Sequence, residues 1–311
     1  MPFLLAMQGA ASQGVLWGVM TLGVYITFKI LDFADLTVDG SFALGGSISS
    51  ILIVMGVDPF LSLLVAFAAG GLSGLVTGLL HTKLKIPGIL AGILTMIALY
   101  SINMRIMGQA NTPLLGVKTM LTGLGQIAGL DKSMSSLVIG VAFSGIIIFA
   151  LYWFFGTELG SAIRATGNNE KMVRALGVDT DAMKNLALML SNALVGLSGA
   201  MVAQSQGYGD VGMGTGTIVI GLASVIIGEV IFGKRFSFWY RLLSVVLGSV
   251  IYRVIIAVVL QLGMKSTDLK LLTAIIVAVA LALPVIRSNM VKRKNRIAND
   301  RAAELLKEAQ R

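Results

Sequence analysis

The residues of this chain that could do chemistry are few, and their types exclude several kinds of site. The sequence has no cysteine and one histidine, His81. Disulfide bonds, thiol catalysis, and thiolate or multi-histidine metal sites are therefore excluded. The sequence shows no paired carboxylates of a soluble catalytic cleft and no nucleophile beside a base, so it does not predict an enzyme.

Two glycine-rich stretches match nucleotide-binding motifs by letter only. Gly207, Gly209 and Gly212 spell G-x-G-x-x-G, and residues 228–234 spell G-x-x-x-x-G-K. Neither stretch follows a predicted strand, and Arg235 stands where a phosphate loop has the Ser or Thr that holds magnesium. We therefore expect no nucleotide or other cofactor on this chain. The glycines of the first stretch are interpreted as allowing a tight re-entrant turn or the close approach of the backbone to a ligand.

Three aspartates interrupt an apolar region in the stretch LDFADLTVDGS, residues 31–41. Lipid does not tolerate such residues, so they face a cavity, a helix end or water. One interpretation is a broken helix whose turn lines a translocation path. The other is a cytoplasmic hairpin with capping aspartates. With polar residues of later helices, the candidate path residues are Asp35, Thr37, Asp39, Asn103 and Gln204.

The largest polar excursion lies between two long apolar runs, at residues 156–181. One short helix is predicted inside it, because Asn169 can cap a helix start and Gly177 can end it. Met172, Val173 and Leu176 fall on one face of that helix. A helix this short needs a partner surface. The stretch is therefore either a docking element or an ordinary loop with a helical turn.

The elements that must position these residues are membrane helices. Of 311 residues, 56% are hydrophobic and 13% are charged, about half the charged fraction of a soluble domain. Apolar runs of about 20 residues can cross the hydrocarbon core. We predict an all-α polytopic transmembrane bundle with about nine spans. They are residues 13–31, 41–57, 59–80, 86–107, 134–155, 182–203, 218–232, 242–262 and 269–286.

Small residues and a long connection add detail to this bundle. The spacing of Gly14 and Gly18, and of Gly70, Gly74 and Gly78, predicts close helix packing. Residues 108–133 are predicted to be a long mixed loop. Its apolar residues indicate a packed cover; among them are Leu114, Leu115 and Leu121.

Cationic loops set the predicted orientation. The net charge is +9, and in a membrane chain this favours cytoplasmic loops that face anionic lipid over binding to nucleic acid. The cationic segments are residues 83–85, 164–174, 234–241 and the tail. With nine spans the N-terminus lies outside and the C-terminus inside. The chain divides into a membrane domain, residues 1–286, and a basic cytoplasmic tail, residues 287–311.

Three segments carry a resemblance to a known family. Residues 159–179, LGSAIRATGNNEKMVRALGVD, closely resemble the cytoplasmic loop of ABC-importer permeases of the branched-chain amino-acid and ribose type. The aspartate-rich stretch with the helix after it, and residues 191–200, SNALVGLSGA, are similar to other helices of that family. The form LDFADLTVDGS resembles a bacterial subgroup linked to amino-acid uptake, aromatic substrates included.

The resemblance implies a permease subunit of the bacterial plasma membrane. Two ATPase subunits, which bind ATP and Mg²⁺, would dock on its cytoplasmic face. An extracellular or periplasmic binding protein would deliver substrate, and a second permease copy, as a homodimer or a sister subunit, would complete the path. Residues 168–177 would be the coupling helix. The residues expected to serve coupling are Arg164, Asn168, Asn169, Glu170, Lys171, Arg174 and Gly177.

Other functions stay open at this point. The substrate could be a sugar, a nucleoside or a vitamin instead of an amino acid. A secondary transporter or channel would work without an ATPase, and its expected mark is an intramembrane charge relay. Arg253 and Glu229 are the deep candidates for such a relay. A structural membrane subunit of another complex is a further alternative.

Overall fold

The computed structural model describes residues 2–129, 131–232, 237–265, 268–269, 271–279 and 282. Its described elements are helices apart from one two-stranded sheet, and seven helices are long and apolar enough to cross a membrane. The predicted all-α polytopic bundle is confirmed. The elements are α1 (Pro2–Tyr25), the π-helix η1 (Ile26–Ile30), α2 (Thr37–Val54), α3 (Pro59–Thr82), α4 (Gly88–Met107), β1 (Asn111–Pro113), α5 (Met120–Ala128), α6 (Lys132–Gly156), α7 (Glu158–Asn168), α8 (Glu170–Ala175), α9 (Thr180–Gln206), β2 (Tyr208–Asp210), α10 (Thr217–Phe232) and α11 (Phe238–Gln261).

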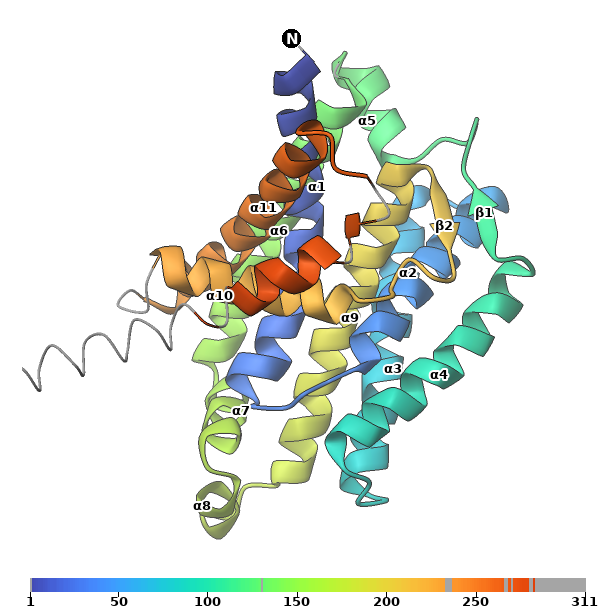
Figure 1. Cartoon of the computed structure of the whole chain (residues 1–311). Helices are drawn as coiled ribbons and strands as arrows, with labels where there is room; N and C mark the ends of the chain where they lie inside the picture. Colours follow the sequence, from blue (N-terminus) through green and yellow to red (C-terminus); the bar gives the residue numbers. More distant parts are fainter. Residues whose placement is uncertain are drawn as a thin grey trace, which may run out of the picture.

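The centre of the bundle is formed by α1, α2 and α9, whose apolar stretches are the most buried of the seven spans (Figure 1). The helices α3, α4, α6 and α11 pack around them and leave much of their apolar surface exposed. Phe149 on α6, for example, is 73% exposed. Exposed apolar surface of this extent suits hydrocarbon surroundings.

Glycines let these helices touch backbone to backbone, as their spacing predicts. A Cβ atom on Gly74 of α3 would overlap the carbonyl of Leu188 on α9. Gly14 of α1 lies against the backbone of Val250 on α11. The remaining members of the two stripes follow the same pattern: Gly70 and Gly78 meet α9, and Gly18 meets α11. The predicted close packing is confirmed for both stripes.

The helix α10 differs from the other apolar helices in length and direction. It has 16 residues, which is shorter than the roughly 20 residues that cross a bilayer. Figure 1 shows that it runs across the bundle, not along it. The predicted span at residues 218–232 is therefore a short crosswise helix. The predicted span at residues 269–286 lies partly outside the described residues, and the tail from residue 287 lies entirely outside them.

The connection at residues 108–133 is more regular than a loop. It contains β1, α5 and the start of α6, and β1 pairs antiparallel with β2, Asn111 opposite Asp210. A capping box formed by Thr119 and Thr122 begins α5. The predicted cover is confirmed for Leu114 and Leu121, which are buried, but Leu115 is 87% exposed.

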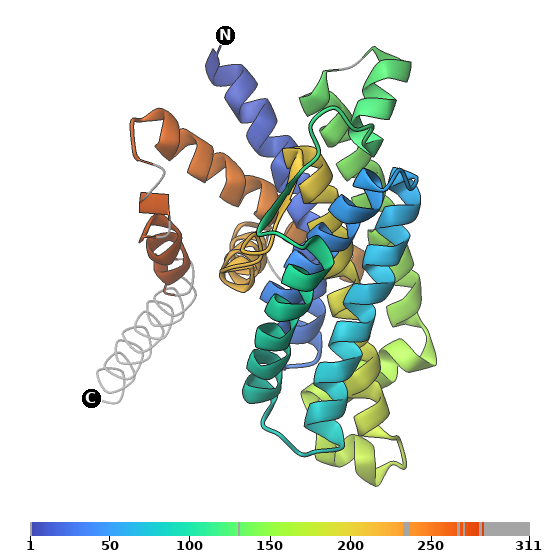
Figure 2. The same ribbon diagram turned by 90° about the vertical axis from the view of Figure 1, so that its right-hand side faces the viewer.

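The two ends of the bundle carry different elements. The short helix α8 and the turn between α3 and α4 lie at one end, and α5 lies with the start of α1 at the other (Figure 1). Helix α9 runs from one end to the other, since it begins just after α8 and ends beside β2. Figure 2 shows α4, α10 and α11 along one side of the bundle.

Candidate functional site

The polar excursion at residues 156–181 forms two helices, where the sequence predicted one. Thr157 caps α7 by accepting a hydrogen bond from the Gly160 amide at 3.3 Å. The Asn169 side chain then accepts from the Met172 amide at 3.1 Å and begins α8. Gly177 has a φ of +86°, a left-handed conformation that suits glycine. The predicted cap and stop of the short helix are both confirmed.

The apolar residues of α8 divide between the bundle and solvent. Val173 is 2% exposed and anchors the helix. Met172 is 49% exposed and Leu176 is 74% exposed, and α8 itself lies at one end of the bundle (Figure 1). Val173 is therefore the only member of the predicted face that packs inward. The other two side chains form a small apolar surface beyond the membrane helices.

An ion cluster holds α8 to the rest of the bundle. The Arg174 Nη2 atom lies 3.1 Å from a Glu170 oxygen and 3.0 Å from an Asp181 oxygen. Lys184 Nζ lies 2.8 Å from the second Glu170 oxygen, and Lys85 Nζ lies 3.3 Å from Asp181. The hydrogen bond from Lys184 lowers the pKa of Glu170, with further help from Arg174. The cluster joins α8, the start of α9 and the α3–α4 turn.

The other predicted coupling residues lie around this cluster. Arg164 on α7 stacks over the ring of Phe238, with 5.7 Å from the guanidinium carbon to the ring centroid, and so touches the start of α11. Asn168 is the last residue of α7 and is exposed. Lys171 is exposed and forms no ion pair with the residues that the structure describes.

Two of the predicted path residues, Asp35 and Thr37, lie in packed polar contacts between helices. Asn192 of α9 donates to Asp35 at 2.6 Å, and the hydroxyls of Thr37 and Thr77 are 2.7 Å apart. Thr77 also donates to Thr95 at 2.9 Å. Asp35 is 2% exposed and Thr37 is fully buried. These contacts tie α3, α4 and α9 to the start of α2.

Gln204 occupies a similar position near the opposite end. Its side chain donates to Ser49, to the Pro59 carbonyl and to Ser62 at 3.1 to 3.2 Å, and accepts from the Met120 amide at 3.0 Å. It thus joins α9 to α2, α3 and α5. It also borders a cavity of about 670 Å³ whose other walls are β1, β2 and residues 114–119. That cavity lies at the end remote from α8.

Asp39 and Asn103 are the two predicted path residues that the structure brings together. Asp39 accepts hydrogen bonds from the Gly216 amide, the Thr217 hydroxyl and the Ile218 amide at 2.8 to 2.9 Å. It therefore caps α10, a helix far away in the sequence, whereas the sequence interpretation concerned caps of the next helix. Gly214 allows this approach, because a Cβ atom there would overlap the Asp39 carbonyl.

A cavity of about 370 Å³ opens beside these two residues. The side-chain nitrogen of Asn103 donates weakly to the Gly40 carbonyl at 3.4 Å, and its side-chain oxygen is buried with no hydrogen-bond partner among the described residues. An acceptor without a partner can receive a hydrogen bond from a solute. The cavity is lined by Asp39, Gly40, Ala43, Met96, Ile97, Tyr100, Asn103, Val211 and Thr215.

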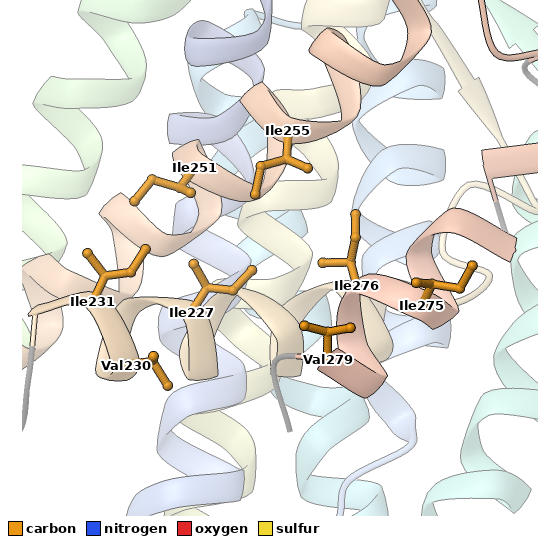
Figure 3. Close-up of a pocket in the computed structure, with 8 residues that line it drawn as sticks. All are labelled: Ile227, Val230, Ile231, Ile251, Ile255, Ile275, Ile276 and Val279. Atoms are coloured by element: carbon orange, nitrogen blue, oxygen red, sulfur yellow. The ribbon is translucent and has the colours of Figure 1, made fainter. Parts of the chain in front are cut away.

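A second hollow on the same side of the bundle is entirely apolar. It lies between α10, α11 and the helical residues 271–279, with a volume of about 320 Å³ (Figure 3). Its lining offers no hydrogen bond to a polar solute. The residues are Ile227, Val230, Ile231, Ile251, Ile255, Ile275, Ile276 and Val279.

The deep charged residues do not form a relay in the described part of the chain. Glu229 of α10 pairs with Lys29 at 3.3 Å. Arg253 of α11 lies over the ring of Trp17, with 3.9 Å between the guanidinium carbon and the ring centroid. No ion pair between described residues includes Arg253.

Comparison with known proteins agrees with the sequence resemblance. A family model described as "Branched-chain amino acid transport system / permease component" matches residues 6–282. A tyrosine transport system permease protein of Clostridioides difficile is 42% identical over 271 residues, 87% of this chain and 88% of that one. An uncharacterized protein of Rickettsia prowazekii is 32% identical over 88% of this chain and 95% of its own. No solved structure matches the chain.

A more distant relative is named for the transport of branched-chain amino acids, as the family model is. A probable branched-chain amino acid transport permease protein of Methanocaldococcus jannaschii is 28% identical over 205 residues, which is 61% of this chain and 63% of that one. The helical bundle, the two-helix excursion and the relatives therefore agree with the family that the sequence resembles.

Proposed function

The chain belongs to the branched-chain amino-acid and ribose type of ABC permeases, and from this premise we propose that it forms the membrane path of an importer for an aromatic amino acid. Its relatives are permease components and not enzymes. The observation that supports this substrate class is the 42% identity, over 87% of this chain, with a permease named for tyrosine transport. Alternative substrates of the family are a leucine-like amino acid, a sugar, a nucleoside or a vitamin.

The proposed coupling element is α8. Its exposed residue Met172 and the adjoining Leu176 would enter a groove of a partner ATPase, and Arg164, Asn168 and Lys171 would add polar contacts at its rim. The chain's own ion pairs through Glu170 and Arg174 support this arrangement, because they fix α8 to the start of α9. A push on α8 would then move α9, which runs the length of the bundle.

In this proposal ATP and Mg²⁺ are bound by the partner ATPase, and this chain binds no cofactor. The α8 end faces the cytoplasm of a bacterial cell, as its cations favour. The predicted cytoplasmic position of the C-terminal tail, residues 287–311, also belongs to the proposal. A binding protein would meet the opposite end, near the cavity that Gln204 borders. A second copy of the permease would complete the path.

The proposed path passes the cavity at Asp39 and Asn103. The unpartnered Asn103 oxygen supports this position, since it could receive a hydrogen bond from a solute that carries an amino group. Asp39 keeps α10 in place beside the cavity. Asp35, Thr37 and Gln204 would serve as the packed walls of the path, because their polar atoms already bond to neighbouring helices.

Copurification and uptake test the proposal together. The tagged chain is expressed with the candidate ATPase and binding protein of its own organism, purified, and reconstituted in vesicles with labelled L-tyrosine. The expected result is a stoichiometric ATPase and uptake that needs both ATP and the binding protein. Uptake without ATP would overturn the proposal in favour of a secondary transporter or channel. ATP-driven uptake of leucine or ribose, but not tyrosine, would keep the permease and overturn the substrate.

A further inference from the structure

Arg253 is a charged residue that lies outside the lining of the cavity at Asp39 and Asn103 and outside the coupling element. It lies on α11, within the span Phe238–Gln261. Its guanidinium carbon is 3.9 Å from the ring centroid of Trp17, which lies midway along the apolar span Leu5–Ile30. The positive charge is therefore deep in the membrane, far from the headgroups. Such a charge in a span is costly and marks a functional position more often than a structural one.

Apart from the face of the Trp17 ring, the guanidinium has no partner among the described residues that would compensate this charge. Its Nε atom is buried and makes no hydrogen bond to any residue that the structure describes. None of the ion pairs found between those residues includes it. The side chain as a whole is partly exposed. The N–H groups of an arginine without such partners are available to donate two parallel hydrogen bonds to a planar oxyanion.

The direction of Arg253 separates it from the apolar hollow of Figure 3. Ile251 and Ile255 line that hollow and lie one turn apart on the same face of α11. Arg253 is two residues from each of them, which places it on the opposite face of the helix. That face meets α1, where Gly14 and Gly18 pack against α11. The charge therefore points into the protein and away from the apolar lining.

Two further polar atoms on α1 lack partners near this point. The indole nitrogen of Trp17 is buried and makes no hydrogen bond to a described residue, and the same holds for the side-chain oxygen of Gln13, one turn earlier on the same helix. Buried polar atoms are normally paired, so unpaired ones at one level of one helix need an explanation. A polar solute that visits this level would supply the missing partners.

We propose that Arg253, held in position by Trp17, is an oxyanion site on the translocation route that receives the carboxylate of the transported amino acid. This rests on the proposed function. A bidentate contact between guanidinium and carboxylate gives both strength and orientation. A phospholipid phosphate is the other source of an oxyanion. It is disfavoured, because headgroups lie about 15 Å from the bilayer centre and Trp17 is at mid-span.

Trp17 itself can report on the site. The chain has three tryptophans, and Trp153 and Trp239 are exposed, so Trp153→Phe and Trp239→Phe leave Trp17 as the only emitter of the permease. The assembled complex, prepared with a tryptophan-free ATPase in vesicles, is titrated with L-tyrosine and with tyramine, which lacks the carboxylate. Excitation is set beyond the absorption of tyrosine. We expect a saturable change in Trp17 emission with L-tyrosine and none with tyramine.

Substitutions assign that response to the guanidinium. Arg253→Met should abolish the emission change and lower ATP-driven tyrosine uptake by roughly tenfold or more, the worth of a charged hydrogen bond. Arg253→Lys, which keeps the charge but not the fork, should retain part of both. Arg105→Met is the matched control, because Arg105 is an exposed arginine on α4. It should behave like the unsubstituted chain.

The outcomes separate this inference from the proposed function. If the unsubstituted complex does not take up tyrosine, the proposed function fails. If it does, and Arg253→Met takes up tyrosine equally well with an unchanged Trp17 response, only the oxyanion site fails. A response to phosphatidylglycerol in the vesicles, and not to L-tyrosine, would assign the site to lipid and overturn the proposal. If Arg253→Met does not assemble, an Arg253→Lys variant equal to the unsubstituted chain overturns it.

Discussion

Polar residues are used in opposite ways at α8 and in the interior formed by α2, α3 and α9. At α8 they are charged, partly exposed and joined by ion pairs, such as Arg174 with Glu170 and Asp181. In the interior they are hydroxyls, amides and the carboxyl group of Asp35, all buried and joined by short hydrogen bonds, such as Ser41 with Asn192 at 2.7 Å. Exposed ion pairs contribute little stability, whereas buried polar groups are costly to leave unpaired.

This difference matches two tasks. The interior must keep one arrangement of helices in hydrocarbon, where small residues and interhelical hydrogen bonds replace the hydrophobic effect. The α8 region must keep its shape while leaving a surface free for a partner. We therefore expect substitutions in the interior to change the free energy of unfolding strongly, and substitutions at α8 to change coupling with little loss of stability.

The largest effect is expected at the glycine contact between α3 and α9. Gly74→Leu places a side chain where the Leu188 carbonyl now lies, so the two helices must separate. Overpacking a core usually costs about 1 to 3 kcal/mol, and a clash with backbone cannot be relieved by a rotamer change. We expect a loss of more than about 3 kcal/mol and little folded protein. The measurement is the yield of monodisperse protein and its thermal unfolding in detergent.

A matched glycine controls for the added side chain. Gly145→Leu adds the same atoms to α6 at a position with no neighbour within 4 Å. Its yield and melting temperature should equal those of the unsubstituted chain. Equal behaviour of the two variants would show that the α3–α9 contact is not as close as described.

The next effect is expected at Asn192, the centre of the interior hydrogen bonds. Its side chain accepts from Ser41 and donates to Asp35 and to the Leu188 carbonyl. Asn192→Ala would leave buried partners, including a carboxyl group, without a hydrogen bond. We expect a loss of about 3 kcal/mol in the free energy of unfolding, the upper end of the range for a buried group left without its hydrogen bond.

Asn168→Ala provides the comparison from the other region. Asn168 is exposed at the end of α7, so its substitution should change the free energy of unfolding by less than about 0.5 kcal/mol. Chemical denaturation of both variants in the same detergent gives the difference. A similar small change for both would mean that the buried network does not stabilise the bundle.

A smaller effect on stability, with a larger one on coupling, is expected at Arg174. Arg174→Glu puts a negative charge beside Glu170 and Asp181 and releases α8 from α9. Because the arginine side chain is 56% exposed, the loss of stability should be about 1 kcal/mol or less. We expect normal membrane insertion but a several-fold fall in transport-coupled ATP hydrolysis. Arg105→Glu on α4 is the control, and coupling unchanged in both variants would contradict the proposed role of α8.

The sequence predicted those features that depend on neighbouring residues. Asn169 caps α8 and Gly177 ends its turn because a helix start needs an acceptor and a left-handed residue favours glycine. Gly74 packs on α9 because small residues repeat at helical spacing. These rules act within a few residues of the chain, so the caps and the close helix packing could be predicted without coordinates, whereas β1, α5 and α7 were not predicted.

Features that depend on distant segments could not be predicted. Asp39 caps α10, and its partners Gly216 and Ile218 come from the far half of the chain. Asp35 is buried, and its two oxygens accept hydrogen bonds from Asn192 and from the Thr37 amide. The direction of α10 also follows from tertiary packing, since its apolar sequence suits a span as well as a crosswise helix. Asn192 is a polar residue within an apolar run, and this is the sequence feature that could have indicated its role at the centre of the interhelical hydrogen bonds.

The smallest effect is expected from protonation of Glu170. The hydrogen bond from Lys184 holds the pKa of Glu170 below its ordinary value of 4.5. The folded state therefore gains stability from this group above pH 4.5, and that gain is lost as the pH falls through the lowered pKa. Because Glu170 is 37% exposed, screening by solvent keeps the gain below about 1 kcal/mol. It should appear as faster hydrogen exchange of the α8 amides in acid, after correction for intrinsic rates.

A neutral side chain should remove this dependence on pH. In Glu170→Gln the α8 amides should exchange, after the same correction, at the faster rate at every pH, because the bond to Lys184 no longer titrates. Glu158→Gln, in the first turn of α7, should keep the pH dependence of the unsubstituted chain. If α8 exchanges identically in all three proteins, the ion cluster does not hold the helix. The buried side chain of Val173 would then be the contact that holds α8 to the bundle.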